Sequence, residues 1–389
     1  FSLLFGIFEF IRGTILTGFP WNLIVYSFSE NLNFINVISL IGTYSLNLIV
    51  ISFFTAPAIY VLRKSRREIM VCLLLFILPI LILIYGNSQK QKFLVKEEKK
   101  INYTIRIIGS NISLDRFYKD TLDKEIIEEL ILISSPEKNK KIFFLWPEGM
   151  LPNLYQDEMK VFSKSFKNNF DENHIIGIGL TKREYINNEY EFYNSFSVYD
   201  YNFNLIKDYN KNKLVPFGEF LPFESFLNKI GLKVITNNFG SFTKGYEREI
   251  IQIKDEFGQF KFLPLICYEI IYSGSLFEDQ KFDYIFNISE DGWFGKSIGP
   301  KQHFTHSIFR AIETGKYVIR SANNGVAAII NPLGEIEQKI NYENNGYIDF
   351  DKSKEVSETI FSTYGNKIFV IFILLYIFII FSFNRFKNE

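Results

Sequence analysis

The 389-residue sequence predicts a group of membrane-spanning helices joined to a layered α/β domain. The first observation behind this fold class is the distribution of charge. Residues 1–87 hold 8 charged side chains and residues 367–389 hold 4, so the remaining 74 lie between them. The second is the alternation of short apolar runs with helical patterns in that charged middle part. The mean hydropathy of +0.05 therefore describes neither part.

The overall charge balance argues against one class of function. Lys and Arg number 43, as do Asp and Glu, whereas a nucleic-acid-binding domain normally carries a basic excess. The 2 cysteines do not suggest a disulfide framework, because Cys72 and Cys267 lie far apart in different kinds of sequence. Cys72 lies in an apolar run and is interpreted as a packing residue.

Four apolar stretches predict the membrane part. Residues 34–62, 69–85 and 368–383 carry no charge and approach or exceed the length that crosses about 30 Å of hydrocarbon. Residues 1–18 are apolar except for Glu9 and Arg12, which can pair along one helix face. The chain begins inside this apolar run rather than at a methionine, so we expect earlier spans to precede it.

The charges between the spans predict their orientation. Residues 63–67 hold four positive side chains between two spans, which is typical of a cytoplasmic loop. The polar region then lies outside the cytoplasm, and the tail after the last span returns to it. The loop at residues 18–21 is expected on the same outer face as the polar region. The predicted division is residues 1–87 with about three spans, 88–366 as an outer domain, and 367–389 as a last span with a cytoplasmic tail.

The outer domain is expected to alternate between strands and helices. Helical patterns occur at residues 122–133 and 303–315. Apolar, β-branched runs predict eight strands at residues 103–108, 141–146, 175–180, 249–253, 260–267, 283–288, 317–321 and 326–331. This alternation predicts a layered α/β domain with one extensive core.

Three segments carry candidate chemistry. Cys267 ends an apolar strand at a turn, where the N–H groups of a following helix favour a thiolate. Glu148 follows the run at residues 141–146, at the strand end where open α/β sheets present their ligands. Lys211 and Glu219 flank a turn that contains proline and glycine. The alternatives at this point are a buried packing role for Cys267 and solvated loops for the other segments.

Seven motifs, taken in order, resemble the apolipoprotein N-acyltransferase family over nearly the whole chain. They are LTGFPW (16–21), WPEGMLP (146–152), YNKNKLVPFGEFLPF (209–223), FTKG (242–245), ICYEI (266–270), WFGKSIGPKQH (293–303) and RSANNGVAAIINPLG (320–334). The resemblance implies a multi-pass enzyme of the bacterial cytoplasmic (inner) membrane. Its periplasmic domain would be a nitrilase-like α-β-β-α sandwich that works as a monomer without cofactor or metal.

The resemblance also implies a catalytic triad and three supporting residues, namely Glu148, Lys211 and Cys267 with Glu219, Tyr268 and Glu269. In the chemistry that such a triad permits, the thiol accepts an acyl chain from a phospholipid as a thioester. The glutamate acts as general base and then acid, and the lysine with a backbone amide near Tyr268 stabilises the oxyanion. Glu219 is expected to hold Lys211 or Glu148 in place. The acceptor would be the α-amino group of the S-diacylglyceryl-cysteine at the N-terminus of a lipoprotein.

Some positions depart from the family pattern or need a separate interpretation. Glu290-Asp291-Gly292 stands where Asn-Asp and a small residue are usual, and Phe117 stands where a tryptophan is often found. His303 and His306 share one helix face, but no further metal ligand is near them in the sequence. We therefore expect helix-surface or loop-anchoring roles for the two histidines rather than a zinc site.

Two other functions are compatible with these features. A membrane-anchored nitrilase-type amidase would use the same triad to hydrolyse a small amide, and a non-catalytic scaffold would need no triad at all. Several spans favour lipid substrates, since one anchor suffices for a water-soluble amide. The apolar segment at residues 217–227 is either an arm that enters the membrane interface or packed core.

Overall fold

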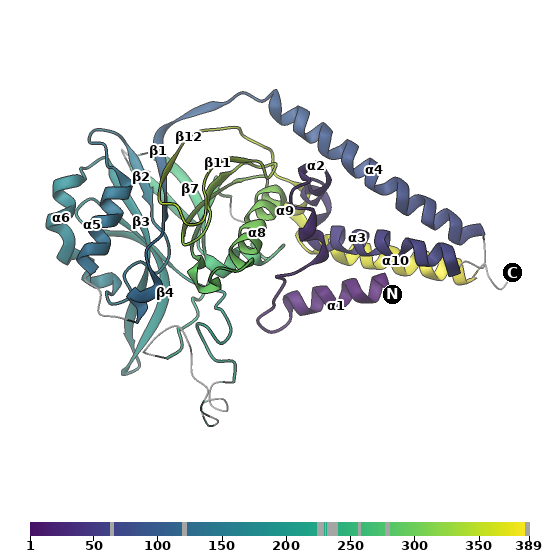
Figure 1. Ribbon diagram of the computed structural model, residues 1–389, viewed down its shortest axis with the longest axis horizontal. Helices are drawn as coiled ribbons and strands as arrows, with labels where there is room; N and C mark the ends of the chain where they lie inside the picture. The colour runs from purple at the N-terminus through teal and green to yellow at the C-terminus, as the bar shows by residue number, and fades with distance from the viewer. Residues whose placement is uncertain are drawn as a thin grey trace.

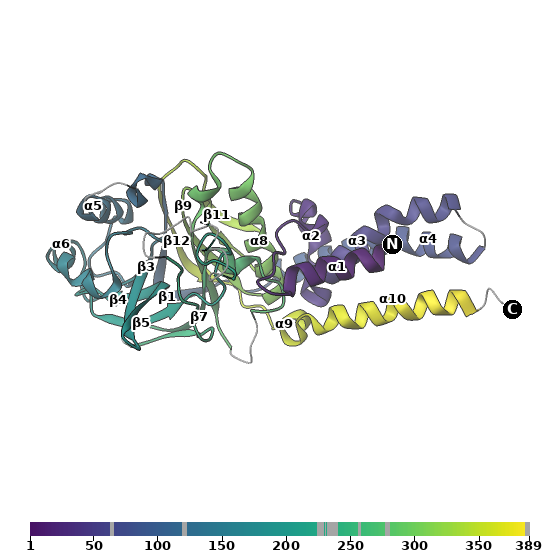
Figure 2. The same cartoon turned by 90° about the horizontal axis from the view of Figure 1, so that it is seen from below.

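The computed structural model describes residues 1–62, 66–118, 123–223, 229, 231, 240–255, 258–276 and 281–385. The molecule is elongated, with an α/β domain at one end and apolar helices that project from it (Figures 1 and 2). The α/β domain runs from β1 to β12, residues 99–353. Both termini lie on the side of the projecting helices, so the two ends of the chain together build this part of the molecule.

The projecting helices are α1 (Ser2–Thr14), α2 (Leu32–Ile35), α3 (Ile38–Leu62), α4 (Arg66–Leu94) and α10 (Lys367–Arg385). In the described part of the chain, α3 and residues Glu68–Leu94 of α4 are long and apolar enough to cross a membrane. The apolar part of α10, Lys367–Ser382, is shorter. Of the about three spans expected before the α/β domain, two reach full span length within the described residues. α4 also continues through a polar stretch beyond residue 88, where the change in composition occurs.

The charge-free run at residues 34–62 is interrupted rather than one continuous helix. Gly42 inside α3 has φ 77° and ψ 166°, outside the helical range. This break leaves the N–H of Thr43 free to donate to the Glu313 carboxylate of α8 (Gly299–Thr314) at 3.0 Å. A Cβ atom at residue 42 would lie 2.0 Å from the ring of Phe361, so glycine is required here. The break therefore attaches α3 to the α/β domain.

The sheet has two halves joined by a short parallel contact. β1 pairs with β9 at Gly109–Ala322 and Ser110–Asn323, within the order β5-β4-β3-β2-β1-β9-β8-β7-β6. β12 pairs with β1, and β10 pairs with both β9 and β11. The strands are β1 (Lys99–Ser110), β2 (Ile142–Leu145), β3 (His174–Ile186), β4 (Glu189–Asp200), β5 (Leu205–Asn210), β6 (Ile251–Asp255), β7 (Gly258–Ile266), β8 (Tyr284–Glu290), β9 (Tyr317–Asn323), β10 (Ala327–Ile330), β11 (Ile336–Ile340) and β12 (Gly346–Ser353). Each of the eight predicted runs overlaps one of these strands.

Three hydrophobic cores separate four layers. In β2, Phe143 and Leu145 belong to the core between the two halves of the sheet, whereas Ile142 and Phe144 pack under α5 (Asp123–Ser134) and α6 (Ser163–Asn169). Because side chains alternate between the faces of a strand, a strand buried on both faces is a continuous apolar run. On the far side, Ile285 of β8 shares a third core with residues of α8. The order helix, sheet, sheet, helix matches the expected α-β-β-α sandwich (Figure 1).

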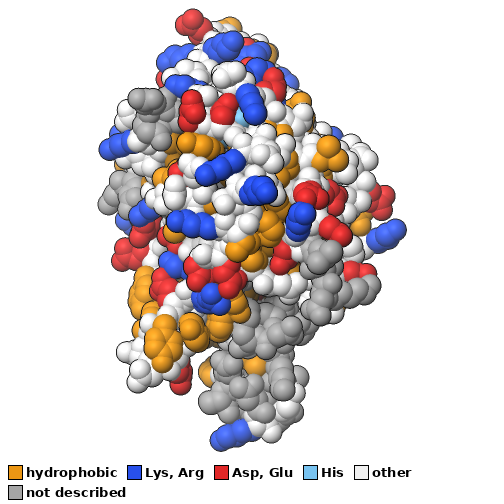
Figure 3. Space-filling view, turned by 90° about the vertical axis from the view of Figure 1, so that its left-hand side faces the viewer, with side chains coloured by type: hydrophobic (Ala, Val, Ile, Leu, Met, Phe, Trp, Pro, Cys, Tyr) orange, Lys and Arg blue, Asp and Glu red, His pale blue; other side chains and the backbone are white. Residues whose placement is uncertain are grey.

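The surface of the α/β domain differs from that of the helices. Figure 3 views the end of the domain farthest from the helices and shows Lys and Arg interspersed with Asp and Glu. The helices instead expose large apolar side chains, for example Phe8 at 67%, Leu74 at 60% and Phe378 at 69%. Charged side chains are typical of a surface in water, and a continuous apolar surface marks contact with lipid or another protein.

A buried ion pair joins the helices to the domain. Glu313 pairs with Arg310 at 2.9 Å, and both side chains are fully buried in α8. Glu313 also accepts from the Ser273 hydroxyl at 2.6 Å, while Arg310 donates to the Thr43 hydroxyl at 3.0 Å. The pair thus connects the break in α3, the turn after β7 and α8.

Replacing Glu313 by Ala should lower the free energy of unfolding by about 3 to 5 kcal/mol, because Arg310 would remain as a buried charge without its counter-ion. Glu358 provides the matched control, since its side chain is 55% exposed and pairs with Lys281 at the surface. We expect Glu358→Ala to change stability by less than about 0.5 kcal/mol. Thermal unfolding in detergent micelles measures both, and equal shifts would contradict the role assigned to Glu313.

Candidate active site

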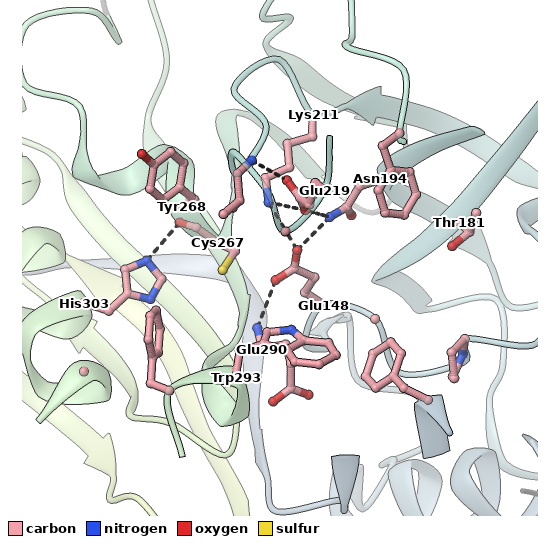
Figure 4. Close-up of a pocket in the computed structure, with 18 of the residues that line it drawn as sticks. Glu148, Thr181, Asn194, Lys211, Glu219, Cys267, Tyr268, Glu290, Trp293 and His303 are labelled. Atoms are coloured by element: carbon pink, nitrogen blue, oxygen red, sulfur yellow. Dashed lines mark hydrogen bonds and ion pairs between the residues drawn. The ribbon is translucent and has the colours of Figure 1, made fainter. Parts of the chain in front are cut away.

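A cavity of about 810 Å³ lies at the carboxyl ends of β2, β7 and β8 (Figure 4). The domain contributes Glu148, Lys211 and Cys267 to its lining, and the loop after α1 contributes Phe19 and Trp21. Most of the other walls are apolar or aromatic, and they include Phe117, Leu151, Tyr155, Leu180, Val215, Phe242, Tyr268, Trp293, Phe294 and Ile298. A large apolar cavity with a few convergent polar groups can hold a chain-like apolar ligand with a polar reacting end.

Lys211 lies between two carboxylates. Its Nζ donates to Glu219 Oε1 at 2.8 Å and lies 3.5 Å from Glu148 Oε1. Asn194 of β4 donates from Nδ2 to both of these oxygens at 2.8 Å. Glu148 Oε2 accepts from the N–H of Glu290 at 3.0 Å. Donors therefore hold both oxygens of Glu148 in place, and Glu219 holds Lys211 as expected from the sequence.

The lysine is buried as a cation. Burial alone would lower the pKa of the Lys211 ammonium, but the charges of Glu219 and Glu148 outweigh it and raise the pKa above its ordinary value. Lys211 is 1% exposed, so this charge acts through a medium with little water. The cavity thus contains a permanent positive charge close to Cys267.

Cys267 begins a short 3₁₀ turn, η5 (Cys267–Ile271), directly after β7. Burial raises the pKa of its thiol well above the ordinary value, and the charge of Glu148 adds to this, while Lys211 acts in the opposite direction. Burial therefore acts against the thiolate that the N–H groups of the following turn were expected to favour. The thiol is protonated at rest and needs a base when it reacts.

The two residues after Cys267 have different positions. Tyr268 lines the cavity, whereas Glu269 is not among the residues that line it. Glu269 is fully buried and accepts from the backbone N–H of Ile266 at 2.9 Å and of Asn212 at 3.0 Å. It thus joins the end of β7 to the loop that carries Lys211.

The two departures from the family pattern lie in one cluster. The Glu290 carboxylate pairs with the Arg116 guanidinium, and both side chains are 1% exposed. Burial raises the pKa of Glu290, and the charge of Arg116 counteracts this. Phe117 packs its ring against that of Trp293, with 4.8 Å between the ring centroids. The acidic side chain at position 290 is therefore accommodated by a buried partner.

His303 and His306 are both fully buried, so a helix-surface role was wrong for either. His303 has a loop-anchoring position, since its Nδ1 lies 2.8 Å from Asp291 Oδ1. Burial alone would raise the pKa of Asp291, but the charges of Arg320 and His303 outweigh it and hold the pKa below its usual range. In the described part of the chain no three His, Cys, Asp or Glu side chains lie together as a set of metal ligands.

The loop after α1 is fastened to the α/β domain. The hydroxyl of Tyr268 donates to the carbonyl of Gly18 at 3.0 Å, and Trp21 Nε1 donates to Gln302 Oε1 at 2.9 Å. The expected Glu9–Arg12 pair forms in α1 at 2.5 Å. The apolar part of the chain therefore supplies one wall of the cavity as well as the helices.

Sequence reasoning missed Asn194, which binds both carboxylates. β4 alternates between its faces, and Asn194 stands two residues from Phe192 and two from Phe196, which belongs to the central core. A polar residue in an apolar series of this kind is the one available signal. This signal identifies Asn194 as a site residue only when the folded structure shows that β4 lies beside Lys211.

Family models match the chain in two places. The carbon-nitrogen hydrolase model matches residues 144–357, and the apolipoprotein N-acyltransferase N-terminal domain model matches residues 1–56. Among solved structures, an amidase from Nesterenkonia sp. is 11% identical, covers 67% of this chain and 94% of its own, and has a TM-score of 0.43.

Curated relatives match nearly the whole chain. Apolipoprotein N-acyltransferase from Rickettsia prowazekii is 32% identical over 96% of this chain and 75% of its own length. The enzyme of that name from Rickettsia bellii is 33% identical over 99% of this chain and 74% of its own. The chain spans 65% to 75% of the length of the relatives it matches. Given this similarity and the carbon-nitrogen hydrolase domain around Cys267, the chain belongs to the apolipoprotein N-acyltransferase family.

Proposed function

We propose that this protein transfers an acyl chain from a phospholipid, through a thioester on Cys267, to the α-amino group of the S-diacylglyceryl-cysteine at a lipoprotein's N-terminus. The observation that carries the proposal is the convergence of Glu148, Lys211 and Cys267 on an apolar cavity. One wall of that cavity comes from the loop of a projecting apolar helix. A lipid donor and a lipoprotein acceptor agree with the family to which the chain belongs.

In the first half of the reaction Glu148 takes the proton from Cys267 Sγ, and the thiolate attacks the ester carbonyl of the phospholipid. The oxyanion that forms is stabilised by Lys211 and the N–H of Tyr268, where one well-placed donor is worth about 3 to 4 kcal/mol. The C–O bond then breaks, and Glu148 returns the proton to the leaving alcohol. The products are a lysophospholipid and the Cys267 thioester.

In the second half the acceptor's amine attacks the thioester. Glu148 takes a proton from the amine, the same donors stabilise the second oxyanion, and the C–S bond breaks. The departing thiolate recovers its proton, so the enzyme ends as it began and the new bond is an amide. Glu219 and Glu269 take no part in the bond changes; they hold Lys211 and the Cys267 turn in place.

We extend the proposal to the arrangement in the membrane. α1, α3, α4 and α10 would embed a monomer in the bacterial cytoplasmic membrane, with residues 1–87 and 367–389 on the membrane side and residues 88–366 in the periplasm. The apolar surfaces of these helices support this arrangement. Part of the positive loop that predicts the orientation, residues 63–65, lies outside the described residues.

Part of the predicted interfacial arm can also be assessed. Phe217 and Phe223 are 50% and 77% exposed, which favours the arm over packed core at these two positions, although Leu221 between them is buried. Residues 224–227 of the same segment lie outside the described residues. An exposed aromatic pair near the cavity suits an interface with lipid head groups.

The acyl intermediate is the most direct test. Purified protein incubated with phosphatidylethanolamine in detergent should gain the mass of one acyl chain on the peptide that contains Cys267, and hydroxylamine should remove it because a thioester is labile to that reagent. Cys267→Ala should show no adduct. Release of ammonia from small amides without an adduct would favour the amidase, and the absence of both reactions would favour the scaffold.

A second test uses two opposite effects of Glu148 on Cys267: its charge raises the pKa of the thiol, and in the proposed mechanism it removes the thiol's proton. Because its charge raises the pKa of Cys267, Glu148→Gln should shift the pH profile of iodoacetamide alkylation to lower pH. Thioester formation should nevertheless fall by about 10²- to 10⁴-fold, since the general base is lost. The wild-type alkylation profile is the reference. A parallel loss of alkylation and acylation would contradict the assignment of Glu148 as a base.

Orientation can be tested in intact spheroplasts. Lys164 and Lys167 are exposed on α6, at the end of the domain that lies away from the helices. A membrane-impermeant amine reagent should label both without permeabilisation, as it does a known periplasmic protein. Labelling that requires a permeabilised membrane would place the domain in the cytoplasm and contradict the orientation.

A further inference from the structure

His303 contacts the backbone of the candidate nucleophile. Its Nε2 lies 3.1 Å from the carbonyl oxygen of Cys267, and a carbonyl can only accept, so Nε2 carries a hydrogen and donates it (Figure 4). The other ring nitrogen, Nδ1, lies 2.8 Å from Asp291 Oδ1. The imidazole therefore bridges a carboxylate and the peptide group that follows the nucleophile.

This peptide group has a special conformation. Cys267 has φ 49°, in the left-handed region that residues other than glycine rarely adopt. Such a conformation persists where the surroundings hold it. The Cys267–Tyr268 peptide also enters the first turn of η5, where N–H groups have no partner within the helix.

The direction of the carbonyl fixes the direction of the next N–H. In a planar trans peptide the C=O and N–H bonds point in opposite directions. The chain has no cis peptide bonds among its described residues, so the rule applies to Cys267–Tyr268. Since the carbonyl is directed at His303, the N–H of Tyr268 is directed away from it. In the proposed mechanism this N–H is the second oxyanion donor beside Lys211.

We propose that His303 is a positioning residue that holds the Cys267–Tyr268 peptide group in the orientation that presents the Tyr268 N–H to the oxyanion. The inference rests on the proposed function and adds how one of its two oxyanion donors is set. His303 does not touch the reacting atoms; it acts through the carbonyl oxygen of Cys267.

The surroundings of His303 favour a fixed ring. Asp291 is itself held by Arg320 at 2.7 Å and by the Ser289 hydroxyl at 2.7 Å, and all these side chains are fully buried. The ring of Trp21 stacks on the imidazole, with 5.5 Å between centroids and 22° between planes. Because the neighbours restrain the ring from several sides, the donor to Cys267 is present before substrate binds. A peptide group held in this way presents the Tyr268 N–H as a preformed donor, which is what oxyanion stabilisation requires.

Two substitutions separate the contact at Nε2 from the contacts at Nδ1, where Asp291 and Arg320 both lie within hydrogen-bond distance. The amide nitrogen of glutamine falls near the position of Nε2, so His303→Gln retains a donor to Cys267. The amide nitrogen of asparagine falls near Nδ1, so His303→Asn retains the contact with Asp291 but loses the one with Cys267. His174→Gln is the matched control, since His174 is also buried and its Nε2 lies 3.1 Å from the Glu137 carbonyl, but it does not line the cavity.

The measurement is the rate of thioester formation from phosphatidylethanolamine, with kcat and KM determined separately. His303→Asn should lower kcat by about 10²- to 10³-fold with KM nearly unchanged, as for the loss of one oxyanion donor. His303→Gln should recover most of that loss, to within about tenfold of the wild type. His174→Gln should lower the melting temperature and leave kcat of the folded enzyme unchanged.

Three results would overturn the inference. The first is a wild-type rate in His303→Asn. The second is an equal loss in the Asn and Gln variants that parallels their melting temperatures, which would indicate a structural role alone. The third is a comparable loss of iodoacetamide alkylation in His303→Asn, since alkylation forms no oxyanion. These results presuppose thioester formation in the wild type; its absence there would count against the proposed function instead.

Discussion

A single lysine lies between two carboxylates, and all three side chains are buried. Lys211 donates to Glu219 at 2.8 Å and lies 3.5 Å from Glu148, and the charges of these carboxylates raise the pKa of its ammonium against the effect of burial. Burial raises the pKa of the Cys267 thiol well above its ordinary value, and the charge of Glu148 adds to this. Transfer of the proton from Cys267 to Glu148 leaves the net charge unchanged. The arrangement thus favours a thiolate only when the proton stays inside the site.

One helix, α8, connects this cluster to the projecting apolar helices. α8 carries His303 near its beginning, beside the Cys267 turn, and Glu313 near its end, beside the break in α3. Both residues are buried. His303 donates to the Cys267 carbonyl, and Glu313 accepts from the N–H of Thr43 in α3. The sixteen residues of α8 therefore connect the nucleophile to the apolar helices through one rigid element. Positions of α3 and of the catalytic turn cannot change independently without breaking buried polar contacts.

The sequence predicted strands best where they are buried on both faces. β2 is a continuous apolar run, β7 and β8 are largely buried with few polar residues, and each was expected at nearly its observed position. β11 and β12 were missed. β11 is exposed and β12 contains several polar residues, so the hydrophobic periodicity and the composition of both segments resemble those of a loop. The apolar run at residues 69–85 correctly located α4 but not the end of the helix. The helix continues beyond that run through polar residues to Leu94, and hydropathy alone does not show such an extension.

The site residues that stand in short motifs were predictable. Those whose role depends on strands and loops that come together only in the folded chain were not. Glu148, Lys211 and Cys267 stand in short distinctive segments, and the structure brings all three to one cavity. Asn194 comes from a strand with no motif, and its contacts exist only because β4 lies beside the loop that follows β5. The burial of His303 and His306 was not predicted, because a helical pattern shows which residues share a face but not what packs on that face.

The wall formed by Phe19 and Trp21 has a consequence for how this protein can be divided. A fragment that begins at residue 88 retains every ionisable group of the cavity but has a gap where these two aromatic side chains stand. In the proposed mechanism, water would reach the acyl group through that gap, and a thioester exposed to water is a substrate for hydrolysis. Under the proposed function, a loop from the apolar helices would therefore help to separate acyl transfer from hydrolysis, because the helices contribute to the cavity itself.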